Sequence, residues 1–285
     1  MTKILALINP LSGSVPPEAE EKLAAALEEL GETCDTKILE GDGFTDLIDE
    51  AIAASPDYLI IWSGDGTVAC ALERAGPDGP PIVALPGGTM NLFHKQIHGG
   101  ACEWQECLTR CLTSGKLIDV PAGCAGDRRF YVAAMAGSLA DLARPREAIR
   151  KGKVLKAIET LAGSDILDLR TSMQFDATAP AGDGSKGFAT AIALFVGDES
   201  SDTLEFAYID PDNPLELAAS GLGALFSDWH EAPGVTTLAA RDVVINEEKG
   251  YELRVTLDGE PIRLPSGTRF GRIAKGGRAI SASIE

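Results

Sequence analysis

The stretch Tyr58–Trp62 (YLIIW) runs directly into Ser63–Thr67 (SGDGT). Its first half is a continuous apolar run, which is typical of a strand buried on both faces of a parallel sheet. Its second half places the carboxylate of Asp65 between two glycines, and Val68–Ala75 continues with a helical pattern. A strand, a glycine turn and a helix in this order bring main-chain N–H groups close to a bound phosphate. The stretch therefore predicts an α/β fold with an anion site at the end of this strand.

Strands and helices alternate around this stretch throughout residues 1–116. The expected strands are Lys3–Asn9, Cys34–Leu39, Asp57–Trp62 and Pro81–Leu85, and the expected helices are Pro16–Leu30 and Phe44–Ala54. Strands separated by helices of this length predict a parallel sheet with right-handed crossovers. Ligands of such sheets bind beyond the carboxyl ends of the strands, where the glycine turns of this half are expected.

The pattern changes after Lys116. Short apolar segments separated by turn residues predict a mostly antiparallel second domain over residues 117–269. The expected strands are Leu117–Pro121, Arg129–Ala134, Leu167–Phe175, Phe188–Val196, Leu204–Ile209, Asp242–Asn246, Glu252–Leu257 and Pro261–Leu264. The fold class is thus a parallel-sheet α/β domain followed by a β-rich domain.

The net charge of −18 argues against nucleic acid as a partner, because phosphate backbones would be repelled. The charge is uneven: residues 18–50 are strongly acidic, whereas residues 144–156 carry a local excess of Arg and Lys. No apolar run approaches the length of a membrane span, and Met1–Ile8 is too short for a signal peptide. We therefore expect a cytoplasmic protein.

The six cysteines contain no CxxC pair, and we interpret them as reduced thiols. His94 and His98 are spaced by four residues, as are Cys107 and Cys111, so each pair would share one face of a helix. A metal site at either pair is the alternative to a structural role.

Three turns carry the chemistry of the first domain: Asn9–Gly13 (NPLSG), Ser63–Thr67 and Pro86–Asn91 (PGGTMN). Each alone is typical of a tight turn after a strand. Together, at one edge of one sheet, they would surround a pocket with backbone donors, hydroxyls and a carboxylate, which suits a nucleoside polyphosphate with Mg²⁺. A P-loop (GxxxxGK[ST]) is missing from the sequence, and none of the three turns contains a dinucleotide fingerprint (GxGxxG).

In order and spacing, these three turns resemble the signatures of the diacylglycerol kinase catalytic domain family, and Asp258-Gly259-Glu260 is similar to its late DGE motif. The family includes bacterial diacylglycerol kinases, sphingosine and ceramide kinases and related bacterial lipid kinases. The resemblance covers nearly the whole chain. It implies that an α/β domain and a β-sandwich face each other across the active-site cleft, with residues from about 270 to 285 returning to the first domain.

The resemblance also implies ATP, Mg²⁺ and transfer of the γ-phosphate to a lipid hydroxyl. Asp65 would organise Mg²⁺ and phosphate or assist hydroxyl deprotonation, and Asp119 matches an acid of a water–Mg²⁺ network. Asp258 would be a metal-linked acid and Glu260 a candidate general base. The nucleotide contacts carried over are Asn9, Ser12, Gly13, Gly64, Gly66, Thr67, Gly88, Thr89 and Asn91.

This sequence departs from the family pattern at three places. Cys70 stands where the family usually has Glu, Leu92 stands where Asp is frequent, and a structural-metal segment is present only as Asp202–Glu205. Two alternatives to a lipid kinase therefore stay open. One is a phosphotransferase similar to NAD kinases, and the other is a nucleotide-binding regulatory protein with weakened catalysis.

The substrate side is predicted from residues 137–156. Gly137–Asp141 is similar to the segment that precedes the lipid pocket in sphingosine-kinase-like members, which makes Asp141 a candidate substrate contact; the alternative is a helix N-terminal acid. Arg144–Lys156 is either a solvated basic face or a surface that docks on anionic lipid at the inner membrane face. The expected partner is a lipid substrate at a membrane surface. A homodimer, in which the partner is a second copy of the chain, is a further hypothesis.

Overall fold

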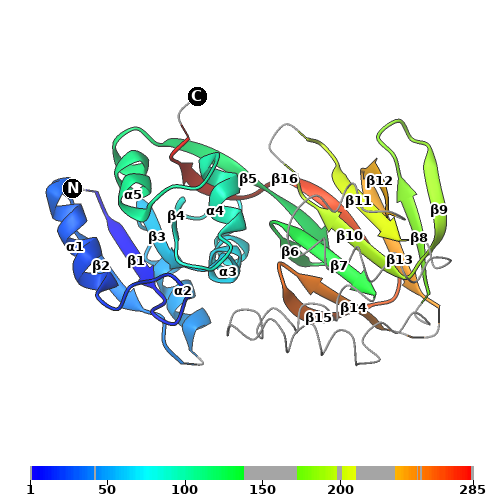
Figure 1. Cartoon of the computed structure of the whole chain (residues 1–285), viewed down its shortest axis with the longest axis horizontal. Helices are drawn as coiled ribbons and strands as arrows, with labels where there is room; N and C mark the ends of the chain where they lie inside the picture. Colours follow the sequence, from blue (N-terminus) through cyan, green and yellow to red (C-terminus); the bar gives the residue numbers. More distant parts are fainter. Residues whose placement is uncertain are drawn as a thin grey trace. The chain divides into compact units, whose positions relative to one another are not determined.

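The computed structural model describes residues 2–41, 43–137, 172–197, 201–209, 235–248, 250 and 252–283 (Figure 1). The predictions for Asp141 and for Arg144–Lys156 lie outside these residues. The chain divides into two compact units: residues 1–122 with 274–285, and residues 123–273. None of the helices in the described ranges is long and apolar enough to span a membrane.

The first unit contains a parallel sheet in the order β2-β1-β3-β4-β16. Its strands are β1 (Ile4–Ile8), β2 (Cys34–Ile38), β3 (Tyr58–Ser63), β4 (Ile82–Pro86) and the last part of β16 (Thr268–Ser281). All neighbouring pairs in this order are parallel. The parallel sheet predicted from the alternation of strands and helices is confirmed.

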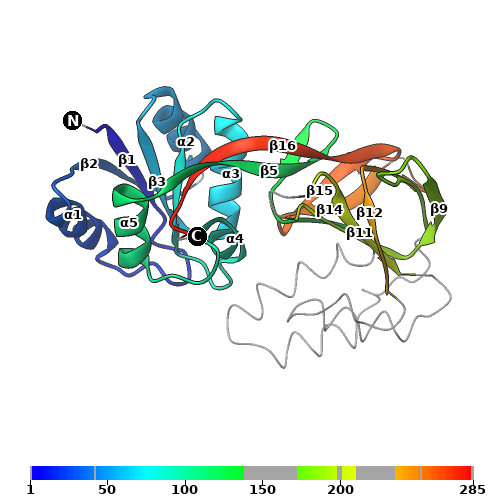
Figure 2. The same cartoon turned by 90° about the horizontal axis from the view of Figure 1, so that it is seen from above.

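Helices cover both faces of this sheet, which explains why its strands are continuous apolar runs. The helices are α1 (Ala19–Glu29), α2 (Phe44–Ala53), α3 (Asp65–Ala75), α4 (Leu92–His98) and α5 (Trp104–Thr113). Helices α1 and α5 lie on one side of the sheet, and α2 and α3 lie on the other (Figure 2). Leu23 and Leu27 of α1 and Cys107, Leu108 and Cys111 of α5 share one core with the strands.

The second unit is a sandwich of two antiparallel sheets. One sheet has the order β16-β13-β8-β9, with β5 beside β16 and β6 beside β5, and the other has the order β12-β11-β10-β7-β14-β15. The apolar core between them draws side chains from both sheets, including Phe175, Val243 and Phe270 from the first and Ile192, Phe206 and Val255 from the second. The predicted fold class is therefore confirmed. The strands are β5 (Lys116–Ala125), β6 (Arg128–Phe130), β7 (Ala133–Gly137), β8 (Met173–Thr178), β9 (Gly184–Ala189), β10 (Ala191–Phe195), β11 (Leu204–Ile209), β12 (Val235–Ala240), β13 (Asp242–Glu247), β14 (Glu252–Leu257) and β15 (Glu260–Pro265).

Two expected strands are each divided in the structure. Arg129–Ala134 covers parts of β6 and β7, and Phe188–Val196 covers parts of β9 and β10. In both cases the chain passes from one sheet of the sandwich to the other at the break. A strand that changes sheets must bend, and an apolar run does not show where it bends.

Candidate functional site

Main-chain hydrogen bonds join the three glycine turns at the carboxyl edge of the parallel sheet. The N–H of Ser14 donates to the carbonyl of Gly87 at 2.9 Å, and the N–H of Gly87 donates to the carbonyl of Ser63 at 3.0 Å. The N–H of Asn9 donates to the carbonyl of Trp62, also at 3.0 Å. The first, second and third turns are therefore one connected structure, which we call the turn cradle (residues 9–14, 63–67 and 86–91).

Hydroxyl groups connect the first two turns of the cradle as well. Ser12 Oγ accepts a hydrogen bond from the N–H of Gly64 at 3.2 Å and lies 3.1 Å from Ser63 Oγ. Ser63 Oγ donates to Thr67 Oγ1 at 2.8 Å. Ser14 Oγ donates to the carbonyl of Gly88 in the third turn. Ser14 and Ser63 were not among the predicted site residues, although both stand next to predicted ones.

The turns approach one another so closely that side chains would not fit. A Cβ atom on Gly88 would lie 3.0 Å from Gly64 Cα, and one on Gly87 would lie 2.7 Å from a methyl group of Val15 and 2.8 Å from Ser63 Cα. A Cβ atom on Gly13 would lie 2.9 Å from Thr89 Oγ1. These glycines are required by close approach of the chain, because none of them has a positive φ. The three turns consequently pack closely against one another.

Asp65 connects the second turn to the helix that follows the third turn. It is the first residue of α3, and its carboxylate accepts hydrogen bonds from the N–H groups of Leu92 at 2.9 Å and Phe93 at 3.1 Å, at the start of α4. Each carboxylate oxygen can accept a second hydrogen bond or bind a cation. Asn91, which precedes α4 with φ +49°, accepts a hydrogen bond from the N–H of Gly88 at 2.7 Å.

These features fit a polyphosphate with Mg²⁺. The N-terminus of α3 directs N–H groups toward the cradle, where an anion is favoured. Asp65 is half-buried and supplies carboxylate oxygen, the ligand type that Mg²⁺ prefers. The other cradle residues predicted to contact nucleotide, among them Thr67, Thr89 and Asn91, lie in the same three connected turns.

Asp119 lies on β5 and forms an ion pair with Lys275 of β16, with 3.4 Å between the carboxylate oxygen and Nζ. The side chain of Asp119 is 55% exposed. An exposed pair of this kind contributes little to stability. Its predicted place in a water–Mg²⁺ network stays a prediction.

Asp258 and Glu260 belong to the second unit, in the hairpin between β14 and β15. Leu257 pairs with Glu260, and Asp258 and Gly259 both have positive φ, so the predicted hairpin turn is confirmed. The Asp258 carboxylate accepts hydrogen bonds from the N–H groups of Tyr131 at 2.7 Å, Val132 at 2.8 Å and Ala133 at 3.0 Å. It thereby holds the segment between β6 and β7. Glu260 is exposed at the first position of β15.

Two of the three departures from the family pattern lie beside the cradle. Cys70 is half-buried on α3, and Leu92 is 39% exposed at the first position of α4. The N–H of Leu92, rather than its side chain, takes part in the site, through Asp65. This contact could have been anticipated only from the position of Leu92 at a helix start, where N–H groups need acceptors.

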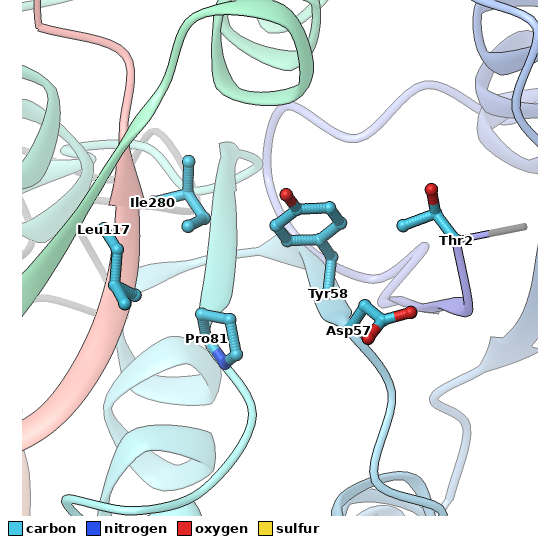
Figure 3. A pocket seen from close by; sticks show the side chains of 6 residues that line it. All are labelled: Thr2, Asp57, Tyr58, Pro81, Leu117 and Ile280. Carbon is cyan, nitrogen blue, oxygen red and sulfur yellow. The ribbon is translucent and has the colours of Figure 1, made fainter.

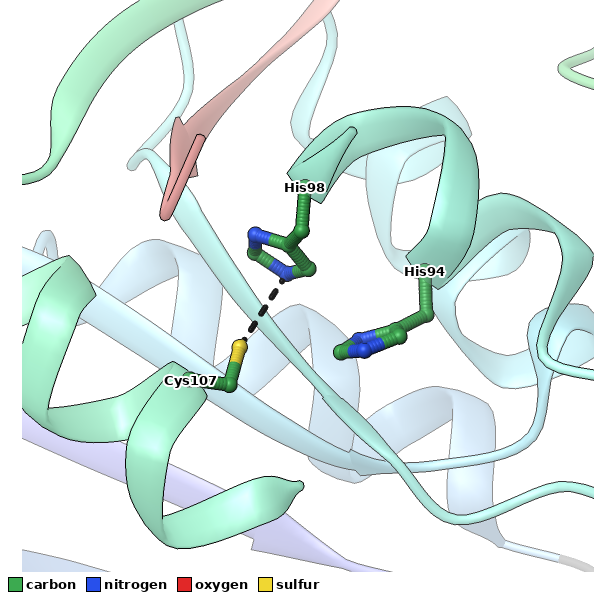
Figure 4. Close-up of side chains that lie close together, drawn as sticks. All are labelled: His94, His98 and Cys107. Carbon is green, nitrogen blue, oxygen red and sulfur yellow. Dashed lines mark hydrogen bonds between the residues drawn. The ribbon is translucent and has the colours of Figure 1, made fainter. Parts of the chain in front are cut away.

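His94, His98 and Cys107 form a buried cluster beneath the sheet edge, and one candidate ligand atom from each lies within 4.8 Å of the others (Figure 4). The N–H of Ala282 donates to His98 Nδ1 at 3.0 Å, so the neutral ring carries its proton on Nε2. His98 Nε2–H in turn donates to the carbonyl of Ala84 at 2.9 Å. Both ring nitrogens of His98 are thus engaged, and the cluster does not fit a metal ion.

A groove of about 530 Å³ lies at the opposite edge of the parallel sheet (Figure 3). It is lined by residues at the amino ends of strands and by two later residues: Thr2, Asp57, Tyr58, Pro81, Leu117 and Ile280. The cradle follows the carboxyl ends of the same strands, so this groove is separate from the candidate site.

Comparisons with known proteins agree with this description. Residues 3–123 match the family model of the diacylglycerol kinase catalytic domain, and all three turns of the cradle fall within that range. A structure of a diacylglycerol kinase from Bacillus anthracis strain Sterne is 18% identical, with a TM-score of 0.66, and the match covers 98% of this chain and 96% of that one. A proposed diacylglycerol kinase from the same strain is 19% identical with a TM-score of 0.70, over 98% of this chain and 96% of that one.

The structural matches span both units, so the two-domain architecture is that of these bacterial structures. At this level of identity they establish the fold. Residues 3–123, which hold the connected glycine turns and Asp65, match the family model of the diacylglycerol kinase catalytic domain.

Proposed function

We propose that the protein is an ATP- and Mg²⁺-dependent lipid kinase that transfers the γ-phosphate to the hydroxyl group of a diacylglycerol-like or sphingoid lipid. The observation that carries the proposal is the turn cradle. Three glycine turns, hydrogen-bonded into one structure, lie around a carboxylate within a diacylglycerol kinase catalytic domain.

The cradle supplies what phosphoryl transfer needs most, which is placement and neutralisation of charge rather than covalent chemistry. A Cβ atom on Gly66 would meet nothing within 4 Å, so phosphate oxygens can approach the main chain at the start of α3. Bound Mg²⁺ would neutralise charge on the phosphates, and Asp65 is the cradle residue suited to hold it. Because Leu92 and Phe93 fix the Asp65 carboxylate, its orientation is set before any ligand binds.

Glu260 is the candidate general base for the lipid hydroxyl. Its carboxylate is exposed at the start of β15, and the turn before it is fixed by the three hydrogen bonds to Asp258. A positioned base contributes about 10²–10⁴-fold to rate. In this proposal Asp258 acts by holding the hairpin that carries Glu260.

Transfer from radiolabelled ATP tests the proposal. The purified full chain is incubated with Mg²⁺ and, separately, with diacylglycerol, sphingosine, ceramide, phosphatidylglycerol and NAD. Label in one of the lipids is the expected result, and a Glu260→Gln variant should transfer at least about 100-fold more slowly. Label in NAD instead would favour the alternative phosphotransferase. ATP binding with no labelled product from any acceptor would favour the nucleotide-binding regulatory protein.

The membrane side of the proposal rests on the sequence of Arg144–Lys156. Each basic residue near an anionic bilayer contributes about 1 kcal/mol to binding. Co-sedimentation with liposomes that contain phosphatidylglycerol should fall when Arg150, Lys151 and Lys153 are replaced by Ser. Equal binding by parent and variant, or equal binding to liposomes without anionic lipid, would contradict this part.

A further inference from the structure

Helix α4 is fastened at both ends, to different parts of the first unit. At its start, the N–H groups of Leu92 and Phe93 hold the Asp65 carboxylate of the cradle. At its end, Ser281 Oγ donates to the carbonyl of Ile97 at 2.7 Å, and His98 Nδ1 accepts from the N–H of Ala282 at 3.0 Å. A helix of seven residues therefore lies between the cradle and the end of strand β16.

His98 makes this second attachment with a defined tautomer. A main-chain N–H can only donate, so Nδ1 of His98 must be the acceptor and the proton must be on Nε2. Nε2–H donates to the carbonyl of Ala84 at 2.9 Å and lies 3.4 Å from Cys107 Sγ (Figure 4). The residue is 6% exposed, so each of these bonds is made away from water.

Ala84 lies on β4, beyond the point where β4 pairs with β16. Strand β16 pairs with β4 through Ala279 and Ile82, two residues before Ala84. The carbonyl accepts instead from His98 Nε2–H and from His94 Nδ1–H, the latter at 3.1 Å. His98 thus links three elements: it belongs to α4, donates to β4 and accepts from the residue that follows β16.

Loss of these bonds would act on the cradle through the helix. Without the imidazole, the buried carbonyl of Ala84 loses one donor and the buried N–H of Ala282 loses its acceptor. A helix of two turns has little stability of its own, so its position depends on the contacts at its ends. A shift of α4 would move the two N–H groups that hold Asp65.

We propose that His98 is a positioning residue for the turn cradle: by fastening α4 to β4 and to the end of β16, it fixes the helix start that orients Asp65. His98 touches no cradle residue in a hydrogen bond of the described structure, and it acts through α4. The consequence for nucleotide binding rests on the proposed function, whereas the consequence for Asp65 does not.

Hydrogen–deuterium exchange in the full chain tests the proposal without any ligand. His98→Leu should speed amide exchange at Ala282 and also at Leu92 and Phe93, at the far end of α4, by about tenfold. His98→Gln should restore most of the protection, because its amide oxygen can accept and its amide N–H can donate. Ile97→Ala is the control, because it removes buried apolar atoms from the same helix and the Ile97 side chain makes none of these hydrogen bonds.

The affinity for ATP with Mg²⁺, measured by titration calorimetry, extends the test to function. His98→Leu should bind about tenfold more weakly than the parent, and His98→Gln within about threefold. The proposal is overturned if His98→Leu and Ile97→Ala, compared at equal losses of stability, have the same exchange at Leu92 and Phe93. If the parent does not bind ATP, the proposed function fails, and exchange at these two amides still decides the role of His98.

Discussion

Two Asp-Gly pairs were expected to serve the same reaction, and the structure gives them different surroundings. Asp65-Gly66 opens helix α3 in the first unit, and the Asp65 carboxylate accepts two main-chain N–H groups, from Leu92 and Phe93. Asp258-Gly259 forms a hairpin turn in the second unit, and the Asp258 carboxylate accepts three, from the segment between β6 and β7.

An Asp-Gly pair can therefore have different surroundings in different parts of the molecule. Asp65 stands among closely packed glycine turns, and its carboxylate has lone pairs left over for a cation. Asp258 has a positive φ of +49°, and its carboxylate satisfies three consecutive N–H groups where the chain leaves one sheet for another. The surroundings of Asp65 therefore support the proposed ligand binding, whereas the hydrogen bonds of Asp258 hold the chain near β7, and its metal-linked role stays a prediction.

The largest effect on stability is expected from Asp258→Ala. It leaves three main-chain N–H groups without their acceptor, so the free energy of unfolding should fall by about 3 kcal/mol. Urea denaturation measures the change. Asp127→Ala, in the exposed two-residue turn between β5 and β6, is the matched control and should change stability by less than about 0.5 kcal/mol. Equal effects of the two variants would contradict the structural role of Asp258.

A smaller loss is expected from Gly88→Ala. The added methyl group would press on Gly64 Cα at 3.0 Å and on Asn91 Oδ1 at 3.1 Å, which should cost about 2 kcal/mol and weaken ATP binding. Gly66→Ala is the matched control in the same cradle, because a Cβ atom there meets nothing within 4 Å and Ala favours the helix. If Gly88→Ala is as stable as Gly66→Ala, the turns are not packed as described.

Asp65→Asn should lower the free energy of unfolding by about 1.5 kcal/mol, less than the loss of the Asp258 carboxylate. The amide oxygen can accept one of the two N–H groups, and the amide nitrogen then faces the other. Asp46→Asn, an acid in the first turn of α2, is the control for loss of a helix N-terminal charge. Urea denaturation at one pH compares the two variants. If Asp65→Asn lowers the free energy of unfolding no more than Asp46→Asn does, the Asp65 carboxylate does not stabilise the start of α4.

The smallest effect is expected from the titration of His94. Burial and the neighbouring His98 lower the pKa of His94 below its ordinary value of 6.5, so the unfolded chain binds a proton more readily than the folded one. Its contribution to stability is therefore complete above pH 6.5 and is lost as the pH falls below that value. The stability of the parent minus that of His94→Gln should decline from pH 7.5 to pH 5.5. A constant difference would show that His94 does not titrate differently on folding.

The contrast between the two units also explains what the sequence could predict. The continuous apolar run Tyr58–Trp62 and the helical spacing of Leu23 and Leu27 are local signals, and they predicted a strand of the parallel sheet and helix α1. The first four residues of strand β9 (GSKGFA) were missed because glycines and polar residues are typical of a loop, whereas the pairing of β9 with β8 is decided by the rest of the sheet.

In the site, likewise, the local features were predictable and the contacts between distant parts of the sequence were not. Each glycine turn follows a recognisable strand, so their shared edge followed from the order of elements. The bond partners did not follow, because the acceptors of Ser14 Oγ and of the Leu92 N–H lie far away in the sequence. The role of His98 was equally hidden, since its partner Ala282 comes 184 residues later.

The most direct test of the central claim is the transfer of label from [γ-³²P]ATP to the lipid acceptor found for the parent, measured for the parent and for Asp65→Asn at equal amounts of folded protein. The account predicts labelled lipid from the parent and at least about a thousandfold slower transfer from Asp65→Asn, because the cradle loses the charge suited to Mg²⁺. Labelling by Asp65→Asn at the rate of the parent would contradict it.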